Sequence, residues 1–175
     1  MSPRFLFVAL LSFYVIPLAL ARDQPPGLPA RAQCDFPDGK NVTVDYFSPG
    51  MNGHKIFGGS VPYGQVWQTG ANQPPTFVTS TNLMVGGKNV PAGHYTIFTI
   101  PDSAKWTLIV NQRTGKLDLP YAYESSELVR IDLTLRPMTS PVENSTITFD
   151  QRRGGCVLNL RWENTEASVL IAETK

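Results

Sequence analysis

The feature that most constrains the fold is an alternation of apolar and polar residues along most of the chain. It is clearest at residues 129–136, where four aliphatic side chains alternate with Arg, Asp, Thr and Arg, and again at residues 156–163. A period of two is that of a strand with one buried face. Turn residues interrupt such runs every 8 to 15 positions. We therefore expect one all-β domain, a sandwich or jelly-roll-like fold of roughly eight to ten antiparallel strands.

Glycine and proline pairs predict how the neighbouring runs connect. Gly86-Gly87 separates the run at 76–85 from 88–90, because glycine tolerates the positive φ of a hairpin turn. Further turns at 91–93 and 101–104 predict a meander with short connections through residue 110. Only one helical turn is expected, near residues 123–128, and its pattern is too short for a stable helix.

The N-terminus has the pattern of a secretory signal peptide. Arg4 precedes the apolar run 5–20, and Ala19-Leu20-Ala21 has the small-x-small form of a cleavage site. An uncleaved membrane anchor is the alternative, but the run is shorter than the roughly 20 residues that span a bilayer. We expect a signal peptide at 1–21, a proline-rich linker at 22–33, a single β domain at 34–175 and no membrane insertion after cleavage.

The chain has two cysteines, Cys34 and Cys156, and an even number in an exported protein predicts a disulfide. The alternation places Cys156 on the inward face of its strand. The alternative is a pair of free thiols, one of them buried as a small apolar side chain. A bridge would tie the beginning of the fold to its penultimate strand.

Composition and motifs exclude several functional classes. A formal net charge of +1 and the absence of long basic runs argue against nucleic-acid binding. The chain lacks the phosphate-binding motif G-x-x-x-x-G-K-[ST], the motif G-x-G-x-x-G and the nucleophile motif G-x-S-x-G. We therefore expect no cofactor.

The segment from Ser48 to Thr76 is the most plausible place for a site. It has no regular period, yet it is rich in glycine, aromatic and amide residues, and long loops inside compact domains are commonly functional. The alternative is a structural cap whose aromatic residues close the end of the sandwich. The candidate ligand-binding residues, including one on the later run 94–100, are His54, Lys55, Tyr63, Trp67, Asn72 and His94.

Two functions from different classes fit these residues. The first is a non-enzymatic envelope protein that binds a small polar ligand or another envelope protein. The second is a hydrolase or isomerase that acts on an envelope saccharide or small metabolite, which would require His54 and His94 to converge beside a carboxylate. No metal is expected, because the two histidines lie 40 residues apart without a close ligand spacing.

An ordered series of short blocks is similar to the DUF2911 family of exported bacterial proteins over residues 42–171. The blocks are KIFGG at 55–59, VPYG at 61–64, VW at 66–67, TGAN at 69–72, GGK at 86–88, PAGHYTIFTIP at 91–101 and WT at 106–107. The resemblance implies a bacterial, periplasmic or extracellular β domain, and it implies no catalytic residue because the function of the family is not known. The family pattern has a basic residue at the position of Gln68 and an acidic one at that of Gln73. Glutamine at both positions argues against acid–base catalysis in this segment.

Overall fold

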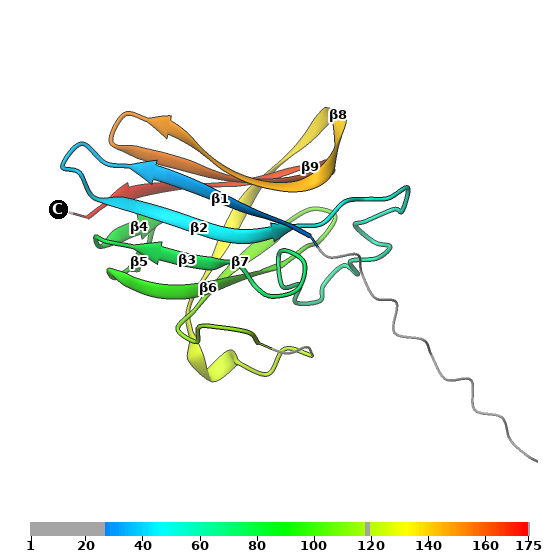
Figure 1. Ribbon diagram of the computed structural model, residues 1–175, viewed down its shortest axis with the longest axis horizontal. Helices are drawn as coiled ribbons and strands as arrows, with labels where there is room; N and C mark the ends of the chain where they lie inside the picture. The colour runs from blue at the N-terminus through cyan, green and yellow to red at the C-terminus, as the bar shows by residue number, and fades with distance from the viewer. Residues whose placement is uncertain (1–26, 118–119, 175) are drawn as a thin grey trace, which may run out of the picture.

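A computed structural model describes residues 27–117 and 120–174, and within them the chain forms nine antiparallel strands (Figure 1). The predicted signal peptide and residues 22–26 of the predicted linker lie outside the described residues. One 3₁₀ turn, η1 (Glu124–Ser126), occupies the position of the expected helical turn. The strands are β1 (Leu28–Asp35), β2 (Asn41–Ser48), β3 (Thr76–Thr79), β4 (Leu83–Val85), β5 (Lys88–Val90), β6 (Gly93–Ile100), β7 (Trp106–Asn111), β8 (Glu127–Arg152) and β9 (Gly155–Glu173).

The strand order β1-β2-β3-β6-β7-β8-β9-β4-β5 becomes a two-layered fold because β8 belongs to both layers. The first part of β8 pairs with β7, and the part from Thr134 onward pairs with β9. Figure 1 shows β8 crossing from one layer to the other. Side chains such as Phe77 and Leu108 from the first layer pack with Leu158 and Ile171 from the second in one apolar core. The predicted all-β antiparallel fold is confirmed.

The linker prediction is wrong for residues 28–33, because β1 already begins at Leu28. Ala32 and Cys34 face the core, and the whole strand pairs with β2. Proline suggested an extended linker, but β1 is an edge strand, where Pro29 is tolerated without disrupting the ladder.

The predicted meander is wrong at one crossing. The run 76–85 divides into β3, which pairs with β6, and β4, which pairs with β9 in the other layer. The division lies at a local turn, where the Thr79 hydroxyl donates to the carbonyl of Thr81 at 2.7 Å and accepts from its N–H at 3.2 Å. Such a hydroxyl offers the backbone an alternative to the ladder. The hairpin between β4 and β5 is confirmed.

Strands β8 and β9 form one long, irregular hairpin rather than several short strands. Their register shifts twice between Pro137 and Thr146. On β9 the even-numbered apolar side chains face the core up to Trp162, and the odd-numbered ones do so from Ala167 onward. The intervening Glu163 has a φ of 52°, which marks the bulge.

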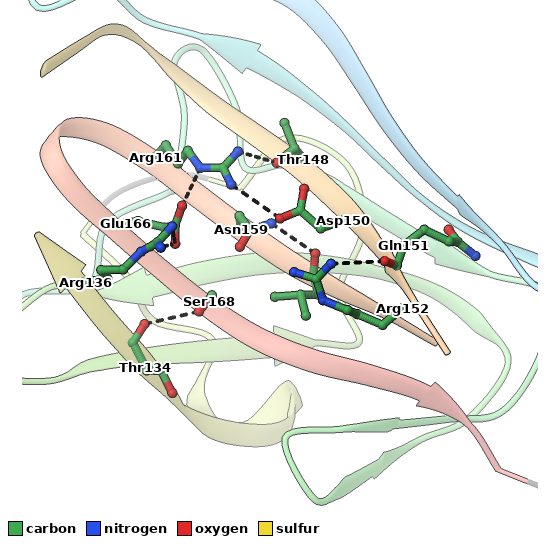
Figure 2. A network of polar contacts seen from close by, with 11 residues as sticks. Thr134, Arg136, Thr148, Asp150, Gln151, Arg152, Asn159, Arg161, Glu166 and Ser168 are labelled. Atoms are coloured by element: carbon green, nitrogen blue, oxygen red, sulfur yellow. Dashed lines mark hydrogen bonds and ion pairs between the residues drawn. The ribbon is translucent and has the colours of Figure 1, made fainter. Parts of the chain in front are cut away.

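A polar network on the outer face of this hairpin holds the irregular region together (Figure 2). Glu166 is 5% exposed, and its two oxygens accept hydrogen bonds from Arg136 at 3.0 Å and from Arg161 at 2.5 Å. Burial opposes ionisation of Glu166, but the hydrogen bonds and charges of the two arginines outweigh it and lower the pKa of the carboxyl group. Arg161 also donates to the Thr148 hydroxyl at 2.9 Å, which links both strands.

The predicted disulfide joins Cys34 on β1 to Cys156 on β9, with their Cα atoms 6.4 Å apart. Both residues are buried, which confirms the inward orientation of Cys156. The bridge connects the edge of one layer to the other layer. Disulfides are characteristic of proteins outside the reducing cytoplasm, so the bridge indicates a non-cytoplasmic location.

Candidate functional site

The segment between β2 and β3, residues 49–75, is fastened to the strands at several points and lies at one end of the fold (Figure 1). Gly50 pairs with Asn144 of β8, and Trp67 pairs with Thr99 of β6. The N–H of Gly64 donates to the carbonyl of Pro101 at 2.9 Å. The segment is therefore a structured loop, as its apolar content predicts.

An aromatic cluster connects this loop to the core. Trp67 stacks on Trp162 of β9, with ring centroids 5.6 Å apart and planes inclined by 21°. Phe57 meets Trp106 of β7 edge-on at 4.6 Å, and it contacts both other tryptophans at 6.1 Å. The rings line part of a small pocket of about 10 Å³, the space of a single water molecule. The loop is thus seated on the sandwich by ring packing.

Glu163, the bulged residue of β9, fixes the first part of the loop. Its carboxylate accepts hydrogen bonds from the backbone N–H of Phe57 at 3.2 Å and of Ile56 at 3.4 Å. The side chains of Ile56 and Phe57 are both buried. The bulge in β9 therefore aims a carboxylate at the loop backbone, which orients the loop against the cluster.

An open cleft of about 390 Å³ lies in the second part of the loop, a volume within the range of small-molecule sites. Every side chain that lines it is uncharged. Val61, Pro62 and Val66 form apolar surface beside Trp67. The polar lining residues are Ser60, Gln65, Gln68 and Asn72.

Several polar groups of the lining residues have no hydrogen-bond partner among residues 27–117 and 120–174. The indole N–H of Trp67 and the side-chain amides of Gln65 and Asn72 make no such bond, whereas Gln68 donates to the carbonyl of Gly70 at 3.2 Å. No side-chain nitrogen or oxygen buried among these described residues is left unpaired, so the partnerless groups face solvent. The cleft thus presents donors and acceptors that a ligand is able to engage.

The backbone beside the cleft is strained. Thr69 has a φ of 61°, in the left-handed region that β-branched residues rarely adopt. Its hydroxyl lies 3.1 Å from that of Thr99 and donates to the carbonyl of Trp67 at 3.2 Å. Asn72 also has a positive φ, 64°, which asparagine tolerates better. Strain of this kind costs about 1–3 kcal/mol and concentrates at functional sites.

The structure brings together only part of the predicted set of site residues. Trp67 and Asn72 line the cleft. Tyr63 is 43% exposed, but its ring lies over Gly58, where an added Cβ would be 2.7 Å from the ring, and it does not line the cleft. His54 and Lys55 are exposed in the first part of the loop.

His94 lies at the opposite end of the fold from this loop. The loop leaves β2 at its last residue, Ser48, whereas the register places His94 beside Val78, near the beginning of β2. His94 is five positions along β6 from Thr99, the partner of Trp67, which corresponds to about 16 Å along the strand. The two histidines therefore do not converge.

Sequence reasoning missed four residues that line the cleft and one residue, Glu163, that orients its loop. The cleft is also lined by Val61, Pro62, Gln65 and Val66. The sequence signal that could have identified them is the pair of glutamines, Gln65 and Gln68, on either side of Trp67. Glu163 was expected only as an outward-facing residue of its strand. The change of inward parity after Trp162 signals the bulge that redirects it.

Residues 27–117 and 120–174 also bear on two other features, metal sites and membrane-spanning helices. No group of three or more His, Cys, Asp or Glu side chains in these ranges is arranged to hold a metal ion. No helix in the same part of the chain is long and apolar enough to cross a membrane.

Comparison with known proteins assigns the chain to a family through its sequence. Residues 29–171 match the family model described as "Protein of unknown function (DUF2911)". No curated protein and no solved structure matches the chain. The match includes the cleft, the aromatic cluster and both cysteines.

Proposed function

Because the chain belongs to the DUF2911 family, whose function is unknown, we propose its function from the geometry of the loop: it is a non-enzymatic binding domain that holds a small polar ligand in the cleft beside Trp67. We propose further that it acts in the bacterial periplasm or outside the cell. The signal-peptide pattern at residues 1–21 and the disulfide between Cys34 and Cys156 support that location.

The observation that carries this proposal is the group of partnerless donors and acceptors in the cleft. Trp67, Gln65 and Asn72 expose an indole N–H and two amides next to apolar surface. An apolar wall with a few convergent polar groups is the usual composition of a ligand site. The strained Thr69 beside them supports the same reading, because backbone strain clusters at ligand and active sites.

The hydrolase or isomerase alternative has less support. His54 and His94 lie at opposite ends of the fold, and neither forms an ion pair with a carboxylate of residues 27–117 or 120–174. No general acid or base lines the cleft. We therefore favour binding without catalysis.

Saturation-transfer NMR on the mature protein tests the proposal. The panel contains neutral sugars, uronic acids, amino sugars, amino acids, dicarboxylic acids and nucleosides. We expect at least one class to bind the unaltered protein and to lose its signal with Asn72→Gly, which removes the amide but suits the positive φ. The control is Gln112→Ala, an exposed glutamine outside the cleft. Binding that is equal in Asn72→Gly and the unaltered protein, or no binding at all, would contradict the proposal.

A further inference from the structure

We propose that the ligand of this cleft is an uncharged saccharide, bound with one apolar sugar face against Trp67 and its hydroxyl groups on the amides. This inference rests on the proposed function and names the chemical class that the cleft selects.

The absence of charge in the lining decides against ionic ligands. All eight lining side chains are neutral, and three of them are primary amides. Placing a carboxylate, phosphate or ammonium group there would remove part of its hydration shell without an opposite charge to replace it. A neutral ligand has no such cost.

The shape of the apolar wall favours a ring with an apolar face. The Trp67 indole is stacked on Trp162, which fixes the ring in place, and Trp67 lines the cleft beside Val66 and Pro62. A rigid, preoriented aromatic surface stacks against the C–H face of a pyranose with little loss of side-chain freedom.

The polar groups match hydroxyls better than they match carboxylates. A hydroxyl both donates and accepts, and so does a primary amide. Gln65 and Asn72 each offer both functions without a partner among the described residues, and Gln68 retains a free acceptor oxygen because only its amide nitrogen is engaged. The indole N–H of Trp67 adds one donor. Together these donors and acceptors are able to form hydrogen bonds with several neighbouring hydroxyl groups of one sugar.

Isothermal titration calorimetry with matched sugars tests this class. The probes are glucose, glucuronate and glucosamine, and then galactose, galacturonate and galactosamine, together with the disaccharides cellobiose and maltose. We expect at least one neutral probe to bind, and to bind about tenfold or more tightly than its two charged counterparts. Asn72→Gly weakens that binding by about tenfold, whereas Gln112→Ala leaves it unchanged.

A variant that introduces a positive charge into the cleft tests whether the preference for neutral sugars is reversed. Gln68→Arg places a guanidinium in the cleft, and we expect it to reverse the preference, so that the uronate binds more tightly than the neutral sugar. Circular dichroism checks that the variant remains folded, and Gln65→Arg on the exposed rim serves as a second such variant.

The outcomes separate this inference from the proposed function. A uronate or amino sugar that binds the unaltered protein as tightly as its neutral partner overturns the neutral-saccharide assignment. If no sugar binds while an amino acid or nucleoside of the panel does, the saccharide class is wrong and the binding function stands. If nothing in either series binds, both fail.

Discussion

The indole ring of Trp67 stacks on that of Trp162, with centroids 5.6 Å apart, so the wall of the cleft is supported directly by a core residue of β9. Trp162 is 3% exposed, and its own indole N–H donates to the carbonyl of Glu143 at 3.0 Å. The position of Trp67 is therefore set by the hairpin of β8 and β9 rather than by its loop alone.

Trp162→Ala tests this support. Removing a buried tryptophan costs about 3–5 kcal/mol in unfolding free energy, measured by urea denaturation. We also expect acrylamide to quench the fluorescence of the two remaining tryptophans more strongly in this variant, because the Trp67 ring loses its stacking partner. The exposed substitution Gln112→Ala should change neither quantity. Unaltered quenching in folded Trp162→Ala would show that the loop holds Trp67 without β9.

The disulfide predicts a large effect on stability. Cys34 and Cys156 are 122 residues apart, and the chain-entropy model assigns a loop of that length about 5 kcal/mol. We expect the double variant Cys34→Ala, Cys156→Ala to lose several kcal/mol in urea denaturation at neutral pH. The same loss should follow reduction of the unaltered protein with dithiothreitol. Equal midpoints for oxidised and reduced protein would contradict the bridge.

Glu166 predicts a pH dependence of stability. Its pKa is lowered in the folded state, so its contribution is fully present above the unfolded pKa near 4.5 and is lost as the pH falls through the folded value. At pH 7 we expect Glu166→Gln to cost about 1.5–3 kcal/mol, since it removes hydrogen bonds between charged groups. The difference between the variant and the unaltered protein should shrink on acidification below pH 4.5. Asp45→Asn, which breaks an exposed ion pair with Arg31, is the matched control and should have no measurable effect.

Tyr121 predicts a late alkaline titration. Burial, together with the neighbouring Glu127 carboxylate, raises the pKa of Tyr121 to about 12. Its hydroxyl donates to Glu127 at 2.9 Å and accepts from the Asn111 amide at 2.8 Å. Its stabilising effect is complete below pH 10 and is lost as the pH rises toward 12. Absorbance at the tyrosinate band should show a late phase that Tyr121→Phe removes. A titration identical in both proteins would contradict the half-buried, hydrogen-bonded arrangement of Tyr121.

The sequence predicts the local parts of this fold better than its long-range pairing. Alternation identified the inward faces of the first part of β8 and of β9 up to Trp162, because the pattern is carried by residues that are neighbours in sequence. It did not show that the chain crosses layers between Thr79 and Leu83, because which strand pairs with which depends on contacts far apart in sequence. The strand β1, which begins inside the segment predicted as a proline-rich linker, was missed because its pairing with β2 outweighs local propensity.

The candidate site was predictable to the level of a segment. Glycine, aromatic and amide content marked residues 48–76, and Trp67 and Asn72 do line the cleft. Composition did not show that Trp67 lines the cleft and Tyr63 does not. The Tyr63 ring covers Gly58, whereas the Trp67 ring reaches Trp162 of β9. His94 was included for its chemistry, and only the register of β3 and β6 places it at the other end.

The most direct test of the central claim is the ¹H–¹⁵N spectrum of the three tryptophan indole groups, recorded while a ligand found in the saturation-transfer panel is added. Trp67 lines the cleft, whereas Trp106 and Trp162 are buried in the core. We expect the Trp67 indole N–H to shift progressively to saturation, with much smaller changes at the other two. A ligand that saturates the protein without moving the Trp67 signal would contradict the assignment of the cleft as the binding site.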